Sequence, residues 1–153
     1  MLSAIQILRH AFSRAEILCL PPNGAKSGEE NYEIRLGLSE PKYDEAKDAW
    51  NLVLDVRFGP GKDTDEVRYK GHFTVAGSFR IREEFNPDLR VSMVRMNGGS
   101  LLLGAVRELV SILTARSTRG PMELVTFDAR TFLKDSPPPE VPESPKLEAP
   151  GEA

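Results

Sequence analysis

The chain has 153 residues, of which 40% are hydrophobic, with 20 basic and 23 acidic side chains. This length predicts one domain with an apolar core. The near balance of charge excludes the basic surface of a nucleic-acid-binding protein and a polybasic membrane-binding segment. The net charge of −3 arises from residue 134 onward, where five acids accompany two bases. The single cysteine, Cys19, excludes an intrachain disulfide and a cysteine zinc site, and is typical of a reducing compartment.

The first fifteen residues, MLSAIQILRHAFSRA, contain serine and arginine but no acid, a composition that organellar transit peptides share. An edge strand is the alternative. The apolar run ends at Arg9 and is too short for a secretory signal or a membrane span. We therefore expect a strand over residues 7–20 in a cytoplasmic protein without membrane insertion.

Three further segments alternate apolar and polar residues, as strands with one buried face do. They are residues 31–39, 50–58 and 67–81. Their apolar positions are Tyr32, Ile34, Leu36, Leu38, Trp50, Leu52, Leu54, Val56, Phe58, Val67, Tyr69, Phe73, Val75, Phe79 and Ile81. The Gly-, Pro- and Asp-containing segment 59–66 predicts a hairpin loop between the last two strands. Together the four strands predict an antiparallel sheet.

A helix is predicted over residues 100–120, because long apolar side chains dominate this segment. Ser100, or Asn97 one turn earlier, can cap its start by accepting a bond from a free amide. Gly120 followed by Pro121 predicts its end.

The apolar residues of this helix spread around most of its circumference, whereas a sheet covers only one stripe. Leaving about five of them in water would forfeit roughly 1.5–3 kcal/mol each. The total, on the order of 10 kcal/mol, rivals the stability of a whole domain. We therefore expect a symmetric oligomer. The predicted interface residues are Leu102, Val106, Leu109, Val110 and Leu113.

A brief second helix is predicted over residues 129–134, with Asp128 as its cap. The last eighteen residues hold six of the twelve prolines, which predicts a disordered tail. The expected organisation is one domain over residues 1–134 and a tail over 135–153. The expected fold is α+β, a four-stranded antiparallel sheet with one long and one short helix on its apolar side.

Catalytic chemistry has few candidate residues. His10 and His72 lie within strand patterns, with no spacing that suggests a nucleophile and a base or a metal site. The stretch GPGKDT lacks the Gly-Lys-Ser/Thr ending of a phosphate loop. We expect a protein that is not an enzyme and needs no metal or cofactor.

Several segments resemble the SecB family, the ATP-independent chaperones of bacterial protein export. Residues 97–120 resemble the family's long helix, with Arg107 and Glu108 at its Arg-Glu pair. Residues 127–133, FDARTFL, resemble its Phe-Asp-Ala motif, and Trp50 stands where the third strand usually has an aromatic residue. The resemblance covers residues 5–134 and depends on the order and spacing of these segments.

The resemblance implies a homotetramer, a dimer of dimers with the long helices between the sheets, which holds non-native polypeptides in apolar grooves. Methionine and aromatic side chains suit such grooves because they adapt to varied partners. The candidate client-binding residues are Tyr32, Trp50, Phe79, Met93, Met96, Phe132 and Leu133. The alternative for each of them is a place in the core.

The chain departs from the family where SecB docks on the SecA motor through carboxylates. Ala15, Cys19 and His72 stand at those positions, and Arg68 and Lys70 lie nearby. Since complementary charge governs such docking, this disfavours SecA binding and an export role. SecB-like chaperones that protect antitoxins in toxin–antitoxin–chaperone systems need no SecA, so we expect that role. The alternatives are an adaptor or assembly protein with one fixed partner and, less favoured, an enzyme.

Overall fold

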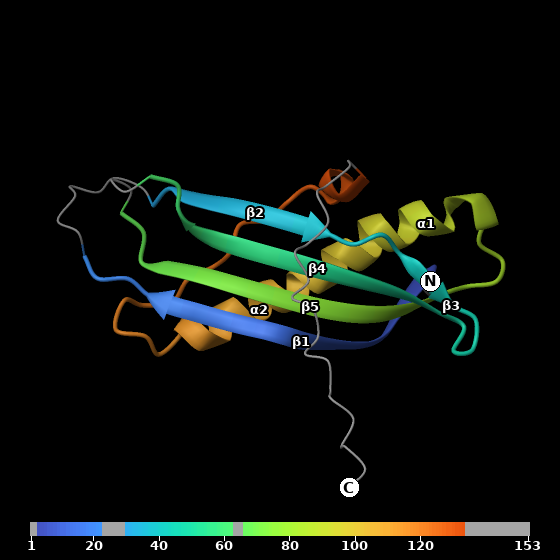
Figure 1. Cartoon of the computed structure of the whole chain (residues 1–153), viewed down its shortest axis with the longest axis horizontal. Helices are drawn as coiled ribbons and strands as arrows, with labels where there is room; N and C mark the ends of the chain where they lie inside the picture. Colours follow the sequence, from blue (N-terminus) through green and yellow to red (C-terminus); the bar gives the residue numbers. More distant parts are fainter. Residues whose placement is uncertain (1–2, 23–29, 63–65, 134–153) are drawn as a thin grey trace, which may run out of the picture.

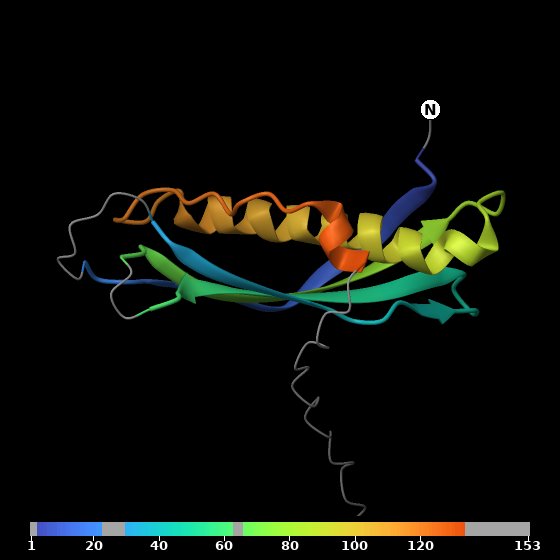
Figure 2. The same ribbon diagram turned by 90° about the horizontal axis from the view of Figure 1, so that it is seen from above.

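The computed structural model describes residues 3–22, 30–62 and 66–133. Five strands form one antiparallel sheet, with the order β1-β5-β4-β2 and with β3 paired to β4. The strands are β1 (Ile5–Cys19), β2 (Tyr32–Leu38), β3 (Lys42–Asp44), β4 (Ala49–Pro60) and β5 (Tyr69–Ile81). Helical segments form a second layer on one side of this sheet, and no helix of the described residues covers the other, here named the open face (Figures 1 and 2). The predicted α+β fold is confirmed.

The count of four strands is wrong, because residues 39–49, which contain β3, are rich in charged residues, include a proline and lack an alternating apolar pattern. Its ladder with β4 spans three residue pairs. Tyr43 packs its ring on Trp50, with the ring centroids 5.2 Å apart. Asp48 adopts the left-handed φ of 47° in the intervening turn. A cross-strand aromatic contact and a tight turn thus define a strand too short for a periodicity signal.

The first strand is longer than predicted and begins at Ile5. Its register on β5 shifts twice, between Ile7 and Arg9 and between Phe12 and Arg14. Each shift inserts one extra residue, which exchanges the faces on which the following side chains lie. These bulges explain why the apolar pattern of this segment is less regular than that of the other strands.

The long helix begins earlier than predicted. Residues 87–114 are helical throughout, as η1 (Pro87–Leu89), α1 (Arg90–Met93), the π-helical turn η2 (Val94–Gly98) and α2 (Gly99–Thr114). Asn86 caps this run by accepting a bond from the Asp88 amide at 3.0 Å, and Pro87 occupies the first turn. The predicted caps are wrong, because Ser100 instead donates to the Met96 carbonyl at 2.7 Å inside the helix. The π-helical turn ends at Gly98 and α2 begins at Gly99, so the backbone remains helical at both glycines.

The helix also ends earlier than predicted, at Thr114. The buried hydroxyl of Thr114 donates to the Val110 carbonyl at 2.8 Å and accepts from the Met122 amide at 2.9 Å. These bonds fix the point at which the chain reverses. Gly120, with a φ of 80°, closes the following turn, where its carbonyl accepts from the Tyr69 hydroxyl.

Residues 121–128, here named the strap, run back beside α2 in the helical layer (Figure 2). Met122 and Leu124 of the strap are buried, and Arg107 donates to the Leu124 carbonyl at 3.0 Å. The strap leads into η3 (Ala129–Leu133), a 3₁₀ turn at the place of the predicted second helix. Asp128 accepts from the Arg130 amide at 2.9 Å, which confirms it as the cap. The predicted tail, 135–153, lies outside the described residues.

The core lies between the helical layer and the apolar face of the sheet. Leu54, Val56, Phe73, Val75 and Val106 are all fully buried there. At the crossing of α2 over β5, Gly77 permits close packing. A Cβ at this glycine would lie only 2.7 Å from the Leu102 side chain. Among the described residues, no helix is long and apolar enough to cross a membrane.

Candidate functional site

The two sides of α2 differ in burial. Leu102, Val106 and Val110 are 0% exposed and face the sheet. On the opposite side Ile112 is 62% exposed. Because α2 has 3.6 residues per turn, residues four positions apart share the sheet-facing stripe. The prediction that Leu102, Val106 and Val110 are interface residues is wrong. They belong to the core of the single chain and offer no surface to a second one.

Part of the predicted interface remains available. Leu113 is 45% exposed at the end of the stripe that begins with Leu102, and Leu109 is partly buried. Leu101 is exposed on the outer side of the helix. Leu113 also borders a hollow of about 590 Å³ that Ile17 and Leu18 of β1 line from the sheet. An apolar surface therefore extends from the outer side of α2 to the neighbouring part of β1.

The predicted client-binding residues do not form one site. Phe79 and Phe132 are buried in the core, at 0% and 2% exposure, so neither offers a surface to a client in the single chain. Phe132 packs on the helix at Gly99, where an added Cβ would lie 3.0 Å from its ring. Leu133 is 46% exposed at the end of η3, and Met96 is partly buried.

Two of the predicted residues lie near exposed apolar side chains that the sequence did not single out. Trp50 is partly buried under Tyr43, which is itself 47% exposed. Leu89 and Val91, at the start of the helical run, are 52% and 43% exposed. Met93 follows them and is partly buried against the core. The apolar pattern of the sequence did not single out Tyr43, Leu89 or Val91. They lie in a short connecting segment, a 3₁₀ turn and the first turn of α1, which are too short to show a periodic pattern.

A second hollow lies between the start of β1 and the helix. Its volume is about 460 Å³, and its lining includes Ile5 from β1 with Met93 and Leu101 from the helical run. Asn97, also in the lining, bonds the Met93 sulfur through its side-chain amide. Of the predicted client-binding residues, Met93 therefore lies on an open, largely apolar surface. Tyr32 lies away from it, at the start of β2, where its ring centroid is 6.1 Å from that of Phe58.

The face of the sheet opposite the helices carries a polar network that spans three strands. Asp55 on β4 accepts from the Thr74 hydroxyl at 2.7 Å and lies 2.8 Å from His72 Nε2. Arg14 on β1 lies 2.7 Å from His72 Nδ1, and Arg57 donates to Asp55 at 3.2 Å. Burial alone would raise the pKa of Asp55. The hydrogen bonds from Thr74, His72 and Arg57 outweigh it and hold that pKa below its ordinary value.

This network joins side chains rather than presenting them to a ligand. Both ring nitrogens of His72 are engaged, so His72 is a structural residue of the sheet. His10 is exposed on β1. No cluster of three potential metal ligands occurs in the part of the chain that the structure describes.

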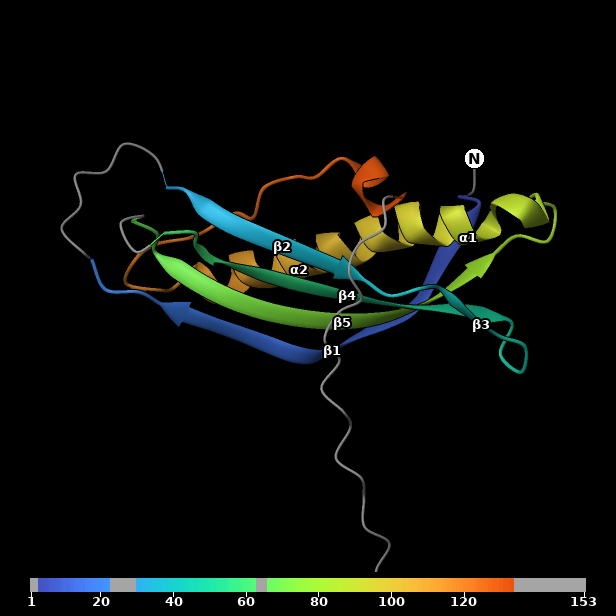
Figure 3. The same ribbon diagram turned by 45° about the horizontal axis from the view of Figure 1, so that its top comes forward.

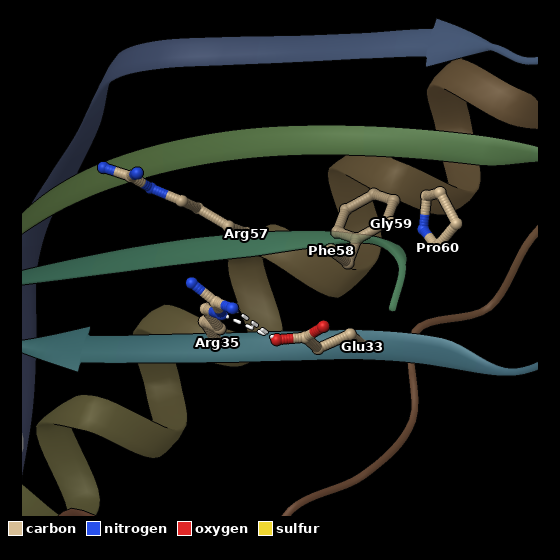
Figure 4. Close-up of a pocket in the computed structure, with 6 residues that line it drawn as sticks. All are labelled: Glu33, Arg35, Arg57, Phe58, Gly59 and Pro60. Carbon is tan, nitrogen blue, oxygen red and sulfur yellow. Dashed lines mark hydrogen bonds and ion pairs between the residues drawn. The ribbon is translucent and has the colours of Figure 1, made fainter. Parts of the chain in front are cut away.

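A shallower hollow of about 210 Å³ lies on the same open face, between β2 and β4. Arg35 and Arg57 are direct neighbours across the two strands. Arg35 turns along β2 to Glu33, with donor–acceptor distances of 2.8 and 2.6 Å, whereas Arg57 extends away from it (Figure 4). Gly59 and Pro60, the first residues of GPGKDT, end β4 here. They do not precede a helix as a phosphate loop does.

Comparison with known proteins gives similarity in structure only. No family model matches the chain, and no curated protein matches its sequence. The structure is similar to that of a SecB-like chaperone from Mycobacterium tuberculosis, solved in complex with an antitoxin peptide. The TM-score is 0.56 and the identity 18%, over 82% of this chain and 91% of that one. The chain has the SecB-like fold.

A protein of unknown function from Streptococcus agalactiae also matches, at 16% identity over 80% of this chain and 97% of that chain. Its TM-score of 0.42 is too low to carry an argument.

On this SecB-like fold, the three positions predicted to replace SecA-docking acids do not share one face. Ala15 and Cys19 pair with Phe73 and Tyr69, whose side chains lie on the helix-facing side. His72 points to the opposite face and is held in the polar network. These three positions of the described chain therefore do not form one surface.

Proposed function

We propose that the protein is an ATP-independent SecB-like holdase that binds unfolded or partly disordered polypeptides. The observation that carries this proposal is the SecB-like fold combined with exposed apolar side chains on its helical layer and at its β3–β4 end. Such surfaces bind extended apolar segments without demanding specific hydrogen bonds.

An antitoxin is the client class that we favour, because the similar mycobacterial chaperone was solved with an antitoxin peptide. The open face of the sheet supports this choice over export. It holds Arg14 and Lys70 near each other on β1 and β5, and Glu16 between them is paired with Arg14. A motor that docks on unpaired carboxylates would therefore meet mainly basic side chains there.

We also propose that the chain assembles, as a homotetramer, through the outer side of α2. Leu101 and Ile112 are 42% and 62% exposed there, and Leu109 beside them is partly buried. Covering them would recover part of the roughly 1.5–3 kcal/mol that each large apolar side chain gains on burial. Sedimentation of the full chain over a range of concentrations tests this, and a monomer throughout would refute it.

The holdase activity is tested with a chemically denatured, aggregation-prone client whose light scattering is followed with and without the full chain. We expect suppression near stoichiometric amounts and no effect of ATP. Val91→Ser, at an exposed apolar position in the first turn of α1, should weaken suppression. Its exposed neighbour offers the matched control, Ser92→Ala, which should leave suppression unchanged. An absence of suppression, together with stoichiometric capture of one folded protein, would replace this proposal with the adaptor alternative.

A further inference from the structure

The two edges of the sheet differ in how regular they are. β1 forms one edge over fifteen residues and breaks its register twice, whereas β2 forms the other over seven residues in an unbroken register. Within the described part of the chain, no strand pairs with the outer side of β2 (Figure 1). A free edge presents unpaired N–H and C=O groups, and bulges are a common device against pairing there. β2 lacks that device.

The helix-facing side of β2 is apolar and only half covered. Tyr32, Ile34 and Leu36 pack against the core but remain partly exposed. The end of the strap and η3 lie in the helical layer just beyond β2 (Figures 1 and 3). There Val125 and Leu133 are 56% and 46% exposed. A strand added to β2 would therefore meet apolar side chains with every second residue.

The other side of β2 favours an acidic neighbour. Arg35 stands directly opposite Arg57 on β4, and like charges in this arrangement destabilise a sheet. The Arg35 side chain is 77% exposed and bonds Glu33 on its own strand. An added strand would place one side chain opposite Arg35 on this open face, beside the hollow between β2 and β4 (Figure 4). A carboxylate there would form a favourable cross-strand pair.

We propose that β2 is a strand-addition site for the client. An extended client segment pairs its backbone with the free edge of β2, places apolar residues at alternate positions on the helix-facing side, and sets Asp or Glu opposite Arg35. This inference rests on the proposed holdase function and specifies how the holdase binds its client. In strand addition, main-chain hydrogen bonds supply affinity and alternate side chains supply specificity.

The probe is a synthetic peptide of seven residues, the length of β2, with Val or Tyr at alternate positions and Asp or Ser between them. Two further versions carry N-methyl groups, one on the odd residues and one on the even residues. Only one of these sets can donate hydrogen bonds to β2, since successive amides of a strand point in opposite directions. We expect one version to bind the full chain at least about tenfold more weakly than the other. Equal binding of the two would overturn the inference.

Charge reversal supplies the test from the protein side. Arg35→Glu should weaken the Asp-containing peptide and strengthen a version with Lys in place of Asp. Arg9→Glu is the matched control, because Arg9 is an exposed arginine at the opposite edge, on β1. It should change neither affinity. Equal effects of the two substitutions would show general electrostatics and contradict pairing at β2.

Failure of the inference differs from failure of the holdase proposal. If the chain suppresses client aggregation while the two N-methylated peptides bind equally, or while the unmodified peptide does not bind, the holdase stands and strand addition is refuted. If neither suppression nor peptide binding occurs, the proposed function itself is refuted. Slower hydrogen exchange at the amides of β2 on addition of the unmodified peptide would support the inference, and unchanged exchange would refute it.

Discussion

Each face of the sheet has side chains that are shielded from solvent, and the reasons differ between the two faces. Leu54 and Val56 on β4 point toward α2 and are fully buried among apolar side chains. Asp55 between them points to the open face and is only 6% exposed, because Thr74, His72 and Arg57 surround its carboxylate. Burial on the first face is stabilising in itself. Burial on the second is tolerated only because each polar atom has partners.

The largest effect is expected on the helix-facing side. Leu54→Ala should lower the free energy of unfolding by about 2–5 kcal/mol, because it leaves a cavity in a packed core. Urea denaturation followed by circular dichroism measures the loss. Leu18→Ala is the matched control on β1, where the leucine is 52% exposed and opposes Lys70. It should cost less than about 1 kcal/mol. Similar losses for the two leucines would mean that the two faces do not differ as described.

A smaller effect is expected from Asp55→Asn. Hydrogen bonds to a charged group contribute about 1.5–3 kcal/mol, so the variant should lose about 2 kcal/mol of stability at neutral pH. The pKa of Asp55 is below its ordinary value of 3.8 in the folded chain. Its stabilisation is therefore complete above that ordinary value and is lost as the pH falls through the lower, folded value.

The difference between the parent and Asp55→Asn proteins should accordingly narrow below about pH 3.8, since Asn does not ionise. Urea titrations of both proteins at neutral and acid pH measure it. A difference that stays constant down to the acid limit would show that the charge of the carboxylate does not cause it, and that the exchange of an acceptor oxygen for an amide donor does.

The sequence predicted one face of the sheet well and the other hardly at all. Alternation places Leu54, Phe73 and Val75 on one side without knowledge of the fold. Within the network around Asp55, the contact of Arg14 with His72 depends on the bulge between Phe12 and Arg14, which sets the face on which Arg14 lies. A bulge is decided by the pairing of β1 with β5, and no local pattern specifies it.

The candidate site was harder to predict than the fold for a similar reason. An aromatic or methionine residue in an amphipathic segment has the same local pattern whether it faces the core or a client. Phe79 is in the core because the helical run covers it at Gly98, whereas Tyr43 is exposed because β3 lies at one end of the sheet (Figure 1). Helix position relative to the sheet, which is a tertiary property, separates these cases.

The smallest effect is expected from Glu33→Gln on the open face. Glu33 and Asp55 each bond an arginine two residues along their own strand, Arg35 and Arg57. Their side chains differ in exposure, at 44% and 8%. An exposed pair contributes about 0–1 kcal/mol and is screened by salt, so Glu33→Gln should lose less than about 1 kcal/mol, and less still at high ionic strength. Urea denaturation at low and high salt measures this. A loss as large as that of Asp55→Asn would show that the ion pair, rather than the burial of its carboxylate, decides the stability of this face.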